Sequence, residues 1–172
     1  MSAQLQVPEP GSRRVVRAMG IGDLDAVMAA EVQAYPFPWT RGNFVDSLAA
    51  GYFMCCLWDD SRQLLGYLVA MHSLDEWHLL NITVAPARQG RGHARALLRH
   101  LITHAVNTGA QSLWLEVRPS NERARRLYVG YDFVAVGLRR GYYPAEGGQR
   151  EDALVMRRAI GVEDKRIGHA LD

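Results

Sequence analysis

The chain has 172 residues, enough for one domain, and 48% of them are hydrophobic, so a core can form without disulfide or metal support. A net charge of +2 argues against a protein whose main task is to coat nucleic acid, and no direct nucleic-acid partner is expected. Lys165, the single lysine among 20 basic residues, lies in a polar C-terminal segment, which excludes enzymes that need a lysine in a phosphate loop or a Schiff base.

The two ends of the chain differ from its centre in composition. We interpret residues 1–13 as a flexible leader, 14–160 as a single domain and 161–172 as a polar tail. No segment resembles a signal peptide or approaches the ~20 apolar residues that span a bilayer. Cys55 and Cys56 are adjacent, which excludes an ordinary disulfide between them. These features predict a cytoplasmic protein without a membrane partner and leave its oligomeric state open.

The first half of the domain alternates short helices with strands. The apolar spacing predicts a strand over 14–19 and a helix over 23–32, and Thr40 is the expected N-cap of a short helix that ends at Ala49. Apolar and β-branched runs then predict three successive strands, over 52–58, 64–73 and 77–85.

The second half begins with a change to helical periodicity. A leucine-rich stripe predicts a helix over 92–107, and Gly109 is the expected stop. Beyond it we expect a strand over 113–117, a helix over 121–129 and strands over 133–138 and 153–156. A helical crossover of this length joins parallel strands, so the order of elements favours the α/β (α+β) class, with one layer of mixed sheet flanked by helices.

A glycine-punctuated turn at the start of the 92–107 helix is the most specific local feature. It presents backbone amides and the positive end of a helix dipole to one point, which suits an anion. The small residues Gly90, Gly92 and Ala94 allow a phosphate to approach the backbone, and nearby arginines add positive charge. Such a turn can also be only a turn, and no third glycine arrives in register for a dinucleotide-binding fingerprint.

Two other residues are candidates for chemistry. Glu116 interrupts an otherwise apolar strand, and alternation places it on the same face as Trp114, where it is either solvated or set in a cleft to accept a proton. Tyr128 lies beside Leu127 in a short helix and is either a packing residue or a proton donor. Neither residue decides the function alone.

The sequence gives little support for a metal site or for a cysteine nucleophile. His93, His100 and His104 fall within about 40° on a helical wheel, but no acidic pair lies near them in sequence, so no metal site is expected. Cys55 and Cys56 lie in an apolar strand without a charge to activate a thiol.

With these residues in place, the chain resembles the GNAT superfamily of acyl-CoA-dependent N-acetyltransferases. Residues 89–94 match the superfamily's pyrophosphate signature Q/R-x-x-G-x-G/A at Gln89, Gly92 and Ala94. The likeness covers roughly residues 14–158. The other matching blocks, in chain order, are Phe37-Pro38-Trp39-Thr40, Leu74-Asp75-Glu76, Asn81-Ile82-Thr83-Val84, Leu113 to Arg118, Ser120-Asn121, Leu127-Tyr128, Arg140 with Tyr142-Tyr143-Pro144, and Arg150 to Ala153.

The resemblance implies the GNAT fold, a mostly antiparallel sheet of about six to seven strands with a central parallel pair, and acetyl-CoA as co-substrate. It implies that Glu116 is the proton acceptor and Tyr128 the proton donor. The residues it assigns to acetyl-CoA are Ile82, Thr83 and Val84 beside the acetyl-pantetheine arm, Gln89, Gly90, Arg91, Gly92, His93, Ala94 and Arg95 around the pyrophosphate, and Asn121 on the pantetheine.

Within the superfamily the blocks are most similar to enzymes that acetylate the N-terminal alanine of a small-subunit ribosomal protein, which implies a protein N-terminus as acceptor. Two alternatives stay open at this point: a small amine, antibiotic or lysine side chain as acceptor, and a non-catalytic module that binds acyl-CoA or the ribosome. One departure from the family is Asp132, where a glycine is usual in a left-handed turn.

Overall fold

The computed structural model describes residues 13–161, so the predicted leader and tail lie almost wholly outside the described residues. Its helices are α1 Leu24–Ala34, α2 Arg41–Ala49, α3 His93–Asn107 and α4 Glu122–Val129. Its strands are β1 Val15–Ala18, β2 Phe53–Trp58, β3 Leu64–Ser73, β4 Glu76–Val84, β5 Ser112–Val117, β6 Val134–Pro144 and β7 Arg150–Ala159. Among the described residues, no helix combines the length and hydropathy needed to cross a bilayer.

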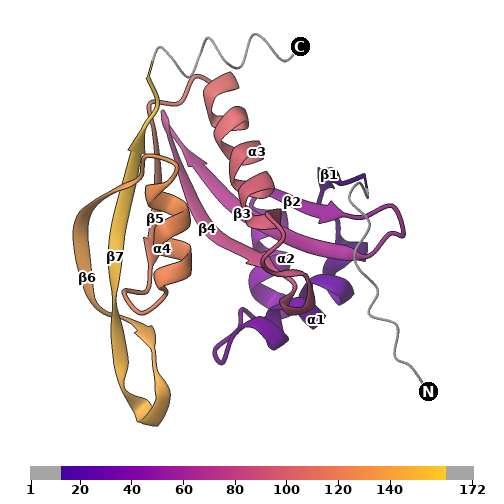
Figure 1. Ribbon diagram of the computed structural model, residues 1–172, viewed down its shortest axis with the longest axis horizontal. Helices are drawn as coiled ribbons and strands as arrows, with labels where there is room; N and C mark the ends of the chain where they lie inside the picture. The colour runs from indigo at the N-terminus through magenta and orange to yellow at the C-terminus, as the bar shows by residue number, and fades with distance from the viewer. Residues whose placement is uncertain (1–12, 162–172) are drawn as a thin grey trace, which may run out of the picture.

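The seven strands form one sheet in the order β1-β2-β3-β4-β5-β7-β6. The β4–β5 pair is parallel and the other neighbours are antiparallel. Helix α3 makes the crossover between β4 and β5 (Figure 1). The mixed sheet with a central parallel pair, predicted from the order of elements and the family resemblance, is therefore confirmed.

The core has two parts, one on each side of the sheet. The leucine stripe of α3, Leu97, Leu98 and Leu101, is fully buried in a cluster with β5 and α4. A second cluster joins α1 and α2 to the sheet through Leu24 and Phe44. One cluster packs the sheet against α3 and α4, and the other packs it against α1 and α2. Because both faces are packed, the central strands provide firm positions for the residues of a site.

The last two strands are longer than the sequence predicted. Strand β6 runs to Pro144 and β7 from Arg150 to Ala159, whereas the pattern indicated 133–138 and 153–156. The β6–β7 register shifts between Ala135 and Gly137 and again between Arg139 and Tyr143, and such irregularities interrupt the alternation on which strand prediction depends. Strand β6 is also the exposed edge of the sheet, so its burial pattern does not alternate.

Three local predictions are confirmed. Thr40 caps α2, because its hydroxyl accepts the amide of Asn43 at 3.2 Å. Asp132 has a φ of 62°, in the left-handed region that the family usually fills with glycine. Gly109 likewise follows α3 with a φ of 76°.

Candidate active site

The central parallel strands part in the middle of the sheet. Their pairing runs from Glu76 opposite Ser112 to Leu79 opposite Leu115 and stops there, although β4 continues to Val84. Figure 1 shows the two strands meeting at one end and separating toward the other. A bulge marks the point of separation, because Val69 of β3 pairs with Asn81 and Ala70 with Leu79, leaving Leu80 as an extra residue.

The backbone of β4 beyond the bulge faces the opening at alternate residues. The amide of Ala85 donates to Leu65 of β3 at 3.0 Å, so Thr83 also directs its backbone groups to β3, and Ile82 and Val84 direct theirs away from it. The side chain of Thr83 is buried, and its hydroxyl donates to Asn81. The structure therefore brings Ile82 and Val84 to the opening and keeps Thr83 inside the sheet.

The amino end of α3 lies just beyond β4. Gly90 and Gly92 both have a φ of 79°, a conformation that L residues with side chains rarely adopt. The first helical hydrogen bond runs from the Ala96 amide to the Gly92 carbonyl at 3.1 Å, so the preceding amides of the turn are not used by the helix. A Cβ at Gly92 would meet no atom within 4 Å, which shows that open space lies in front of the turn.

The other predicted residues of this turn have distinct environments. Gln89 bridges two elements: its Nε2 donates to the Val84 carbonyl at 3.3 Å, and its Oε1 accepts from Arg123 of α4 at 3.2 Å. His93 is 8% exposed and its pKa is lowered, first by burial and then by nearby arginines, so the ring is neutral near pH 7. Arg91 and Arg95 are exposed, and Ala94 is half-buried.

Asn121 begins α4 as its N-cap. Its side-chain oxygen accepts the amide of Ala124 at 3.1 Å, which leaves the amide nitrogen of the side chain for another partner. Arg123, the second residue of the same helix, was not predicted from the sequence. Its contact with Gln89 depends on how α4 packs beside the turn, and no local pattern indicates it.

Glu116 lies one residue beyond Leu115, the last residue of β5 that pairs with β4. Its side chain is 7% exposed, whereas Leu113, Leu115 and Val117 point to the opposite, fully buried side as alternation predicted. One carboxylate oxygen contacts His78 Nε2 at 2.5 Å and the other contacts Arg139 Nε at 3.1 Å. Burial raises the pKa of Glu116, but the hydrogen bond and charge of His78 and the charge of Arg139 outweigh it, so the pKa lies below its usual value.

Tyr128 of α4 is 5% exposed and packs on Phe133 with ring centroids 5.7 Å apart. Burial raises the pKa of its hydroxyl, and the neighbouring hydroxyls of Tyr35 and Tyr143 raise it further. Within residues 13–161 that hydroxyl has no hydrogen-bond partner. Packing thus accounts for the ring, and the unpaired hydroxyl near two other tyrosines remains available for a ligand.

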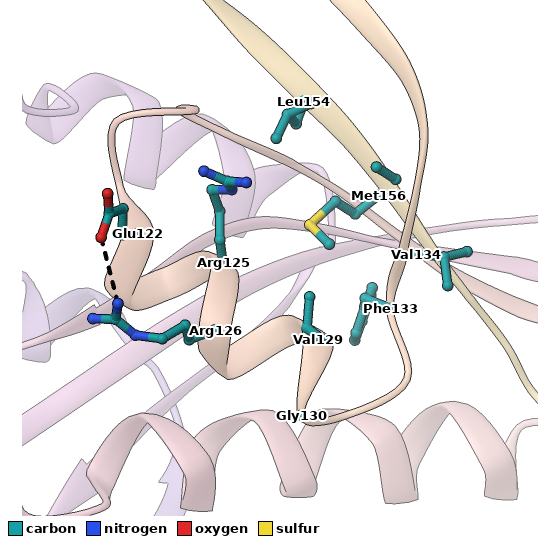
Figure 2. Close-up of a pocket in the computed structure, with 10 residues that line it drawn as sticks. Glu122, Arg125, Arg126, Val129, Gly130, Phe133, Val134, Leu154 and Met156 are labelled. Carbon is teal, nitrogen blue, oxygen red and sulfur yellow. Dashed lines mark hydrogen bonds and ion pairs between the residues drawn. The ribbon is translucent and has the colours of Figure 1, made fainter.

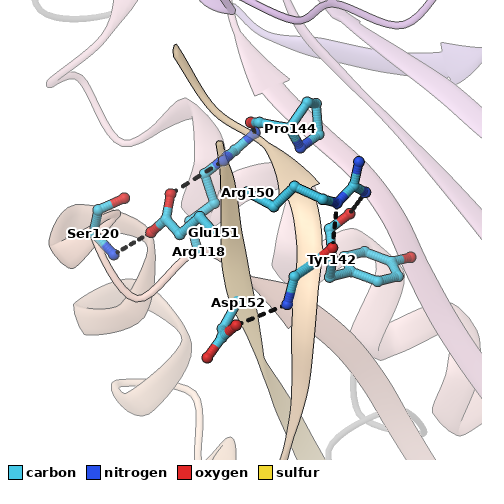
Figure 3. A network of polar contacts seen from close by, with 8 residues as sticks. Arg118, Ser120, Tyr142, Pro144, Arg150, Glu151 and Asp152 are labelled. Atoms are coloured by element: carbon cyan, nitrogen blue, oxygen red, sulfur yellow. Dashed lines mark hydrogen bonds and ion pairs between the residues drawn. The ribbon is translucent and has the colours of Figure 1, made fainter. Parts of the chain in front are cut away.

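A polar network attaches the β6–β7 hairpin to the end of β5 (Figure 3). Arg118 donates to Glu151 at 3.1 Å and to the Pro144 carbonyl at 3.0 Å, and its guanidinium lies 4.4 Å from the ring centre of Tyr143. Glu151 also accepts the amide of Ser120 at 3.0 Å. Burial raises the pKa of Tyr143, and the charges of Tyr142 and then Glu116 raise it further. The contact of Arg139 with Glu116 shows that this hairpin lies beside Glu116.

An apolar groove on the other side of α4 is separate from these residues (Figure 2). It lies between α4 and the β6–β7 strands and is lined by Val129, Phe133, Val134 and Met156, among others. Glu116 and Tyr128 do not line it. The groove therefore lacks both residues that the sequence predicts as catalytic.

The histidine stripe and the thiols have structural roles. His104 stacks on Phe53 with centroids 4.1 Å apart, and His100 lies 5.9 Å from the same ring. Among the described residues no cluster of three metal-ligating side chains occurs. Burial raises the pKa of Cys55 to about 12, which agrees with the prediction that it is not an activated thiol.

Comparison with known proteins identifies the family of this chain. The model of the acetyltransferase (GNAT) family matches residues 24–131, and the chain belongs to this family, so it is an acetyltransferase. The curated relatives include the enzymes called [ribosomal protein bS18]-alanine N-acetyltransferase from Escherichia coli K12, 39% identical, and from Haemophilus ducreyi, 34% identical. Each match covers 78% of this chain, with 89% of the first relative and 92% of the second.

Solved structures agree with the sequence relatives. The crystal structure of the ribosomal-protein-S18-alanine N-acetyltransferase from Escherichia coli superposes with a TM-score of 0.81 at 35% identity, covering 87% of this chain and 96% of that one. Chaetomium thermophilum Naa20 in complex with a bisubstrate analogue has a TM-score of 0.74 at 20% identity, covering 89% of each chain, and shows the shared fold. The GNAT fold expected from the motif blocks is thus confirmed.

Proposed function

We propose that this enzyme transfers the acetyl group of acetyl-CoA to the α-amino group of the N-terminal alanine of ribosomal protein bS18. The choice of acceptor is supported by the 34–40% identity to curated bS18-alanine N-acetyltransferases over nearly their whole length. The observation that carries the chemistry is the opening between β4 and β5, which has Glu116 at its edge. A ribosomal acceptor places the reaction in the cytoplasm.

Acetyl-CoA fits the continuous stretch from β4 to α3. The amides of Gly90 to Arg95 surround the open space at Gly92, where a pyrophosphate can accept from them at the positive end of α3. Ile82 and Val84 turn their backbone groups to the opening, so their amides can hold the pantetheine arm and stabilise the oxyanion that forms on the thioester. Thr83 would contribute through its place in the strand rather than by contact.

Glu116 serves as the general base. Near pH 7 its lowered pKa keeps it ionised, so it can take a proton from the ammonium of the acceptor, directly or through water, and leave a neutral amine that attacks. The amine nitrogen then bonds to the thioester carbon, and the carbon–sulfur bond breaks. A reference α-amino pKa of about 7.7–8.0, against about 10.4 for lysine, makes deprotonation of an N-terminus roughly 3.5 kcal/mol easier.

Tyr128 serves as the acid for the leaving thiolate. Its raised pKa keeps the hydroxyl protonated, so it donates a hydrogen bond to the sulfur as the bond to carbon breaks, and its proton follows late. The proposal is supported by the neighbourhood of Tyr128, whose pKa is also raised by Tyr35, the residue that follows α1, and by Tyr143 of β6.

The test offers acetyl-CoA with three acceptors and identifies the acetylated atom by mass spectrometry. The acceptors are a peptide that begins with alanine, an N-blocked peptide that contains lysine, and a polyamine. We expect acetyl on the α-nitrogen of the alanine peptide. Preferential acetylation of the polyamine or of the lysine would overturn the proposed acceptor, and salt-dependent RNA binding without any transfer would overturn the enzymatic role.

A further inference from the structure

Glu116 is held by two partners of different character. His78 contacts one oxygen from β4, and its side chain is 26% exposed. Arg139 contacts the other oxygen from the edge strand β6, and its side chain is 54% exposed. A register shift separates Arg139 from Tyr143, so this cation sits on the less regular part of the hairpin.

The backbone fixes the position of His78 relative to Glu116. His78 pairs with Trp114 in the parallel register, one residue before the last paired position. Alternation puts Trp114 and Glu116 on one face of β5, and His78 reaches the same face from the neighbouring strand. Because both strands are paired at this point and packed from both sides, the short imidazole cannot move away without disturbing the sheet, whereas the long Arg139 side chain can.

We propose that His78 is a positioning residue for Glu116, fixing one carboxylate oxygen through its Nε2–H so that the other oxygen meets the amine of the acceptor. This inference rests on the proposed role of Glu116 as the base. The ammonium of the acceptor takes the place of the exchangeable Arg139 guanidinium on the second oxygen. Arg139 cannot accept the proton there, because a guanidinium stays protonated in proteins.

His78 also affects the pKa of Glu116. The titratable and charged groups that face its carboxylate are His78 from β4 and Arg139 and Tyr143 from β6, and β7 contributes Val155 opposite in register. The hydrogen bond and charge of His78 lower the pKa of Glu116. Removal of His78 therefore raises that pKa, and the carboxylate becomes protonated at a higher pH than in the parent.

The experiment compares His78→Phe, which keeps a ring but no donor, with His78→Gln, which keeps an N–H that can reach Glu116. His72→Phe is the matched control, because His72 is an exposed histidine at the Trp77 register position of the adjacent strand. We expect His78→Phe to lower kcat about tenfold or more, since hydrogen bonds to charged groups are the strong ones, with KM for acetyl-CoA unchanged. His78→Gln should recover most of the rate, and His72→Phe should match the parent.

A carbon-13 NMR titration of the Glu116 carboxyl supplies a readout that a purely structural role would not move. Its midpoint should rise in His78→Phe and return toward the parent in His78→Gln. Parent-like kcat in His78→Phe would overturn the proposal, as would equal losses in both variants with an unmoved titration.

Glu116→Gln, measured in parallel, distinguishes a failure of Glu116 as the base from a failure of His78 as its positioning residue. Full activity in Glu116→Gln would overturn Glu116 as base, whereas a slow Glu116→Gln with a normal His78→Phe would overturn the role of His78 alone. In the double variant, the loss from His78→Phe should disappear, because a positioning residue has no effect once the residue it positions has lost its function.

Discussion

The two halves of the site are built in different ways. The half assigned to acetyl-CoA comes from residues 82–95, one continuous stretch from β4 through the glycine turn into α3. The half that we propose for the acceptor combines His78, Glu116, Tyr128 and Tyr143, which come from β4, β5, α4 and β6. The first half depends on local turn geometry, and the second depends on strand register and on the attachment of a hairpin.

This difference explains why the halves tolerate change differently. In the turn, the proposed anion site depends on the backbone amides of Gly90 and Gly92, so most of their side-chain neighbours can vary without loss of that site. On the acceptor side each function depends on one side chain held by residues far away in sequence. We therefore expect the largest single losses of rate on the acceptor side and losses of acetyl-CoA affinity on the other.

The largest effect is expected for Glu116→Gln. Loss of a general base typically lowers turnover by ~10² to 10⁴-fold, and the defect should shrink as pH rises, because the amine then loses its proton without help. Initial rates from pH 6 to 9, with acetyl-CoA affinity by calorimetry, measure this. Glu76→Gln is the control, a carboxylate at the closed end of the same strand pair. Parallel pH profiles for Glu116→Gln and the parent would show that Glu116 is structural.

Tyr128→Phe should come next. Phe keeps the packing on Phe133, and the Tyr128 hydroxyl has no hydrogen-bond partner among residues 13–161 to lose, so stability should stay near that of the parent while turnover falls by at least ~10²-fold. Single-turnover rates and the melting temperature separate the two effects. Tyr52→Phe, a partly buried tyrosine in the cluster with α1 and α2, is the matched control. A fully active Tyr128→Phe would leave thiolate departure to water.

Most of the fold could be predicted from the sequence because its signals are local. Strand β3 was predicted with the bounds that the structure shows, and α2 began after its N-cap Thr40 as expected. The hairpin strands β6 and β7 were predicted too short, because two register shifts and an exposed edge remove the alternation from β6. A pattern with a period of two cannot be recognised where the backbone itself departs from that period.

The candidate site residues at 82–95, Glu116, Asn121 and Tyr128 were predicted through the family resemblance, whereas the contacts between strands gave no signal in the sequence. The motif at 89–94 led directly to the turn at α3, but His78, Arg118 and Arg139 were missed. Alternation alone put Glu116 on the Trp114 face, and only the register that pairs His78 with Trp114 places the imidazole beside it. The sequence does not show that two residues on different strands are in contact until the register of those strands is known.

Gly92→Ala tests the acetyl-CoA half by itself. A Cβ there would enter the open space in front of the turn, so acetyl-CoA affinity should fall about tenfold, as expected when hydrogen bonds to a charged group are lost. Gly109→Ala is a close control, because Gly109 has a φ of 76°, has no atom within 4 Å of its Cβ position and lies at the other end of α3. Both changes should cost about 1–2 kcal/mol of stability, and only Gly92→Ala should weaken acetyl-CoA. Equal affinity in both would remove the turn from the cofactor site.

The smallest effect is expected for Arg118→Ala, which loosens the hairpin without touching the base or the acid. Arg118 is 29% exposed, and its ion pair with Glu151 is partly screened, so each contact contributes little by itself. Together the ion pair, the hydrogen bond to Pro144 and the contact with Tyr143 hold the hairpin against β5. Their loss should raise KM for an alanine peptide by a few-fold, about 1 kcal/mol, and leave KM for acetyl-CoA unchanged.

The control for Arg118→Ala is Arg157→Ala, which removes an arginine 5.5 Å from the Trp114 ring at the other end of β7. It should leave both KM values near those of the parent, because the β7 register through Trp114 stays paired without it. Steady-state kinetics with each substrate varied in turn decide the matter. If Arg118→Ala raised KM for acetyl-CoA as much as for the peptide, the hairpin would serve both substrates, and the division of the site into a continuous cofactor half and an assembled acceptor half would fail.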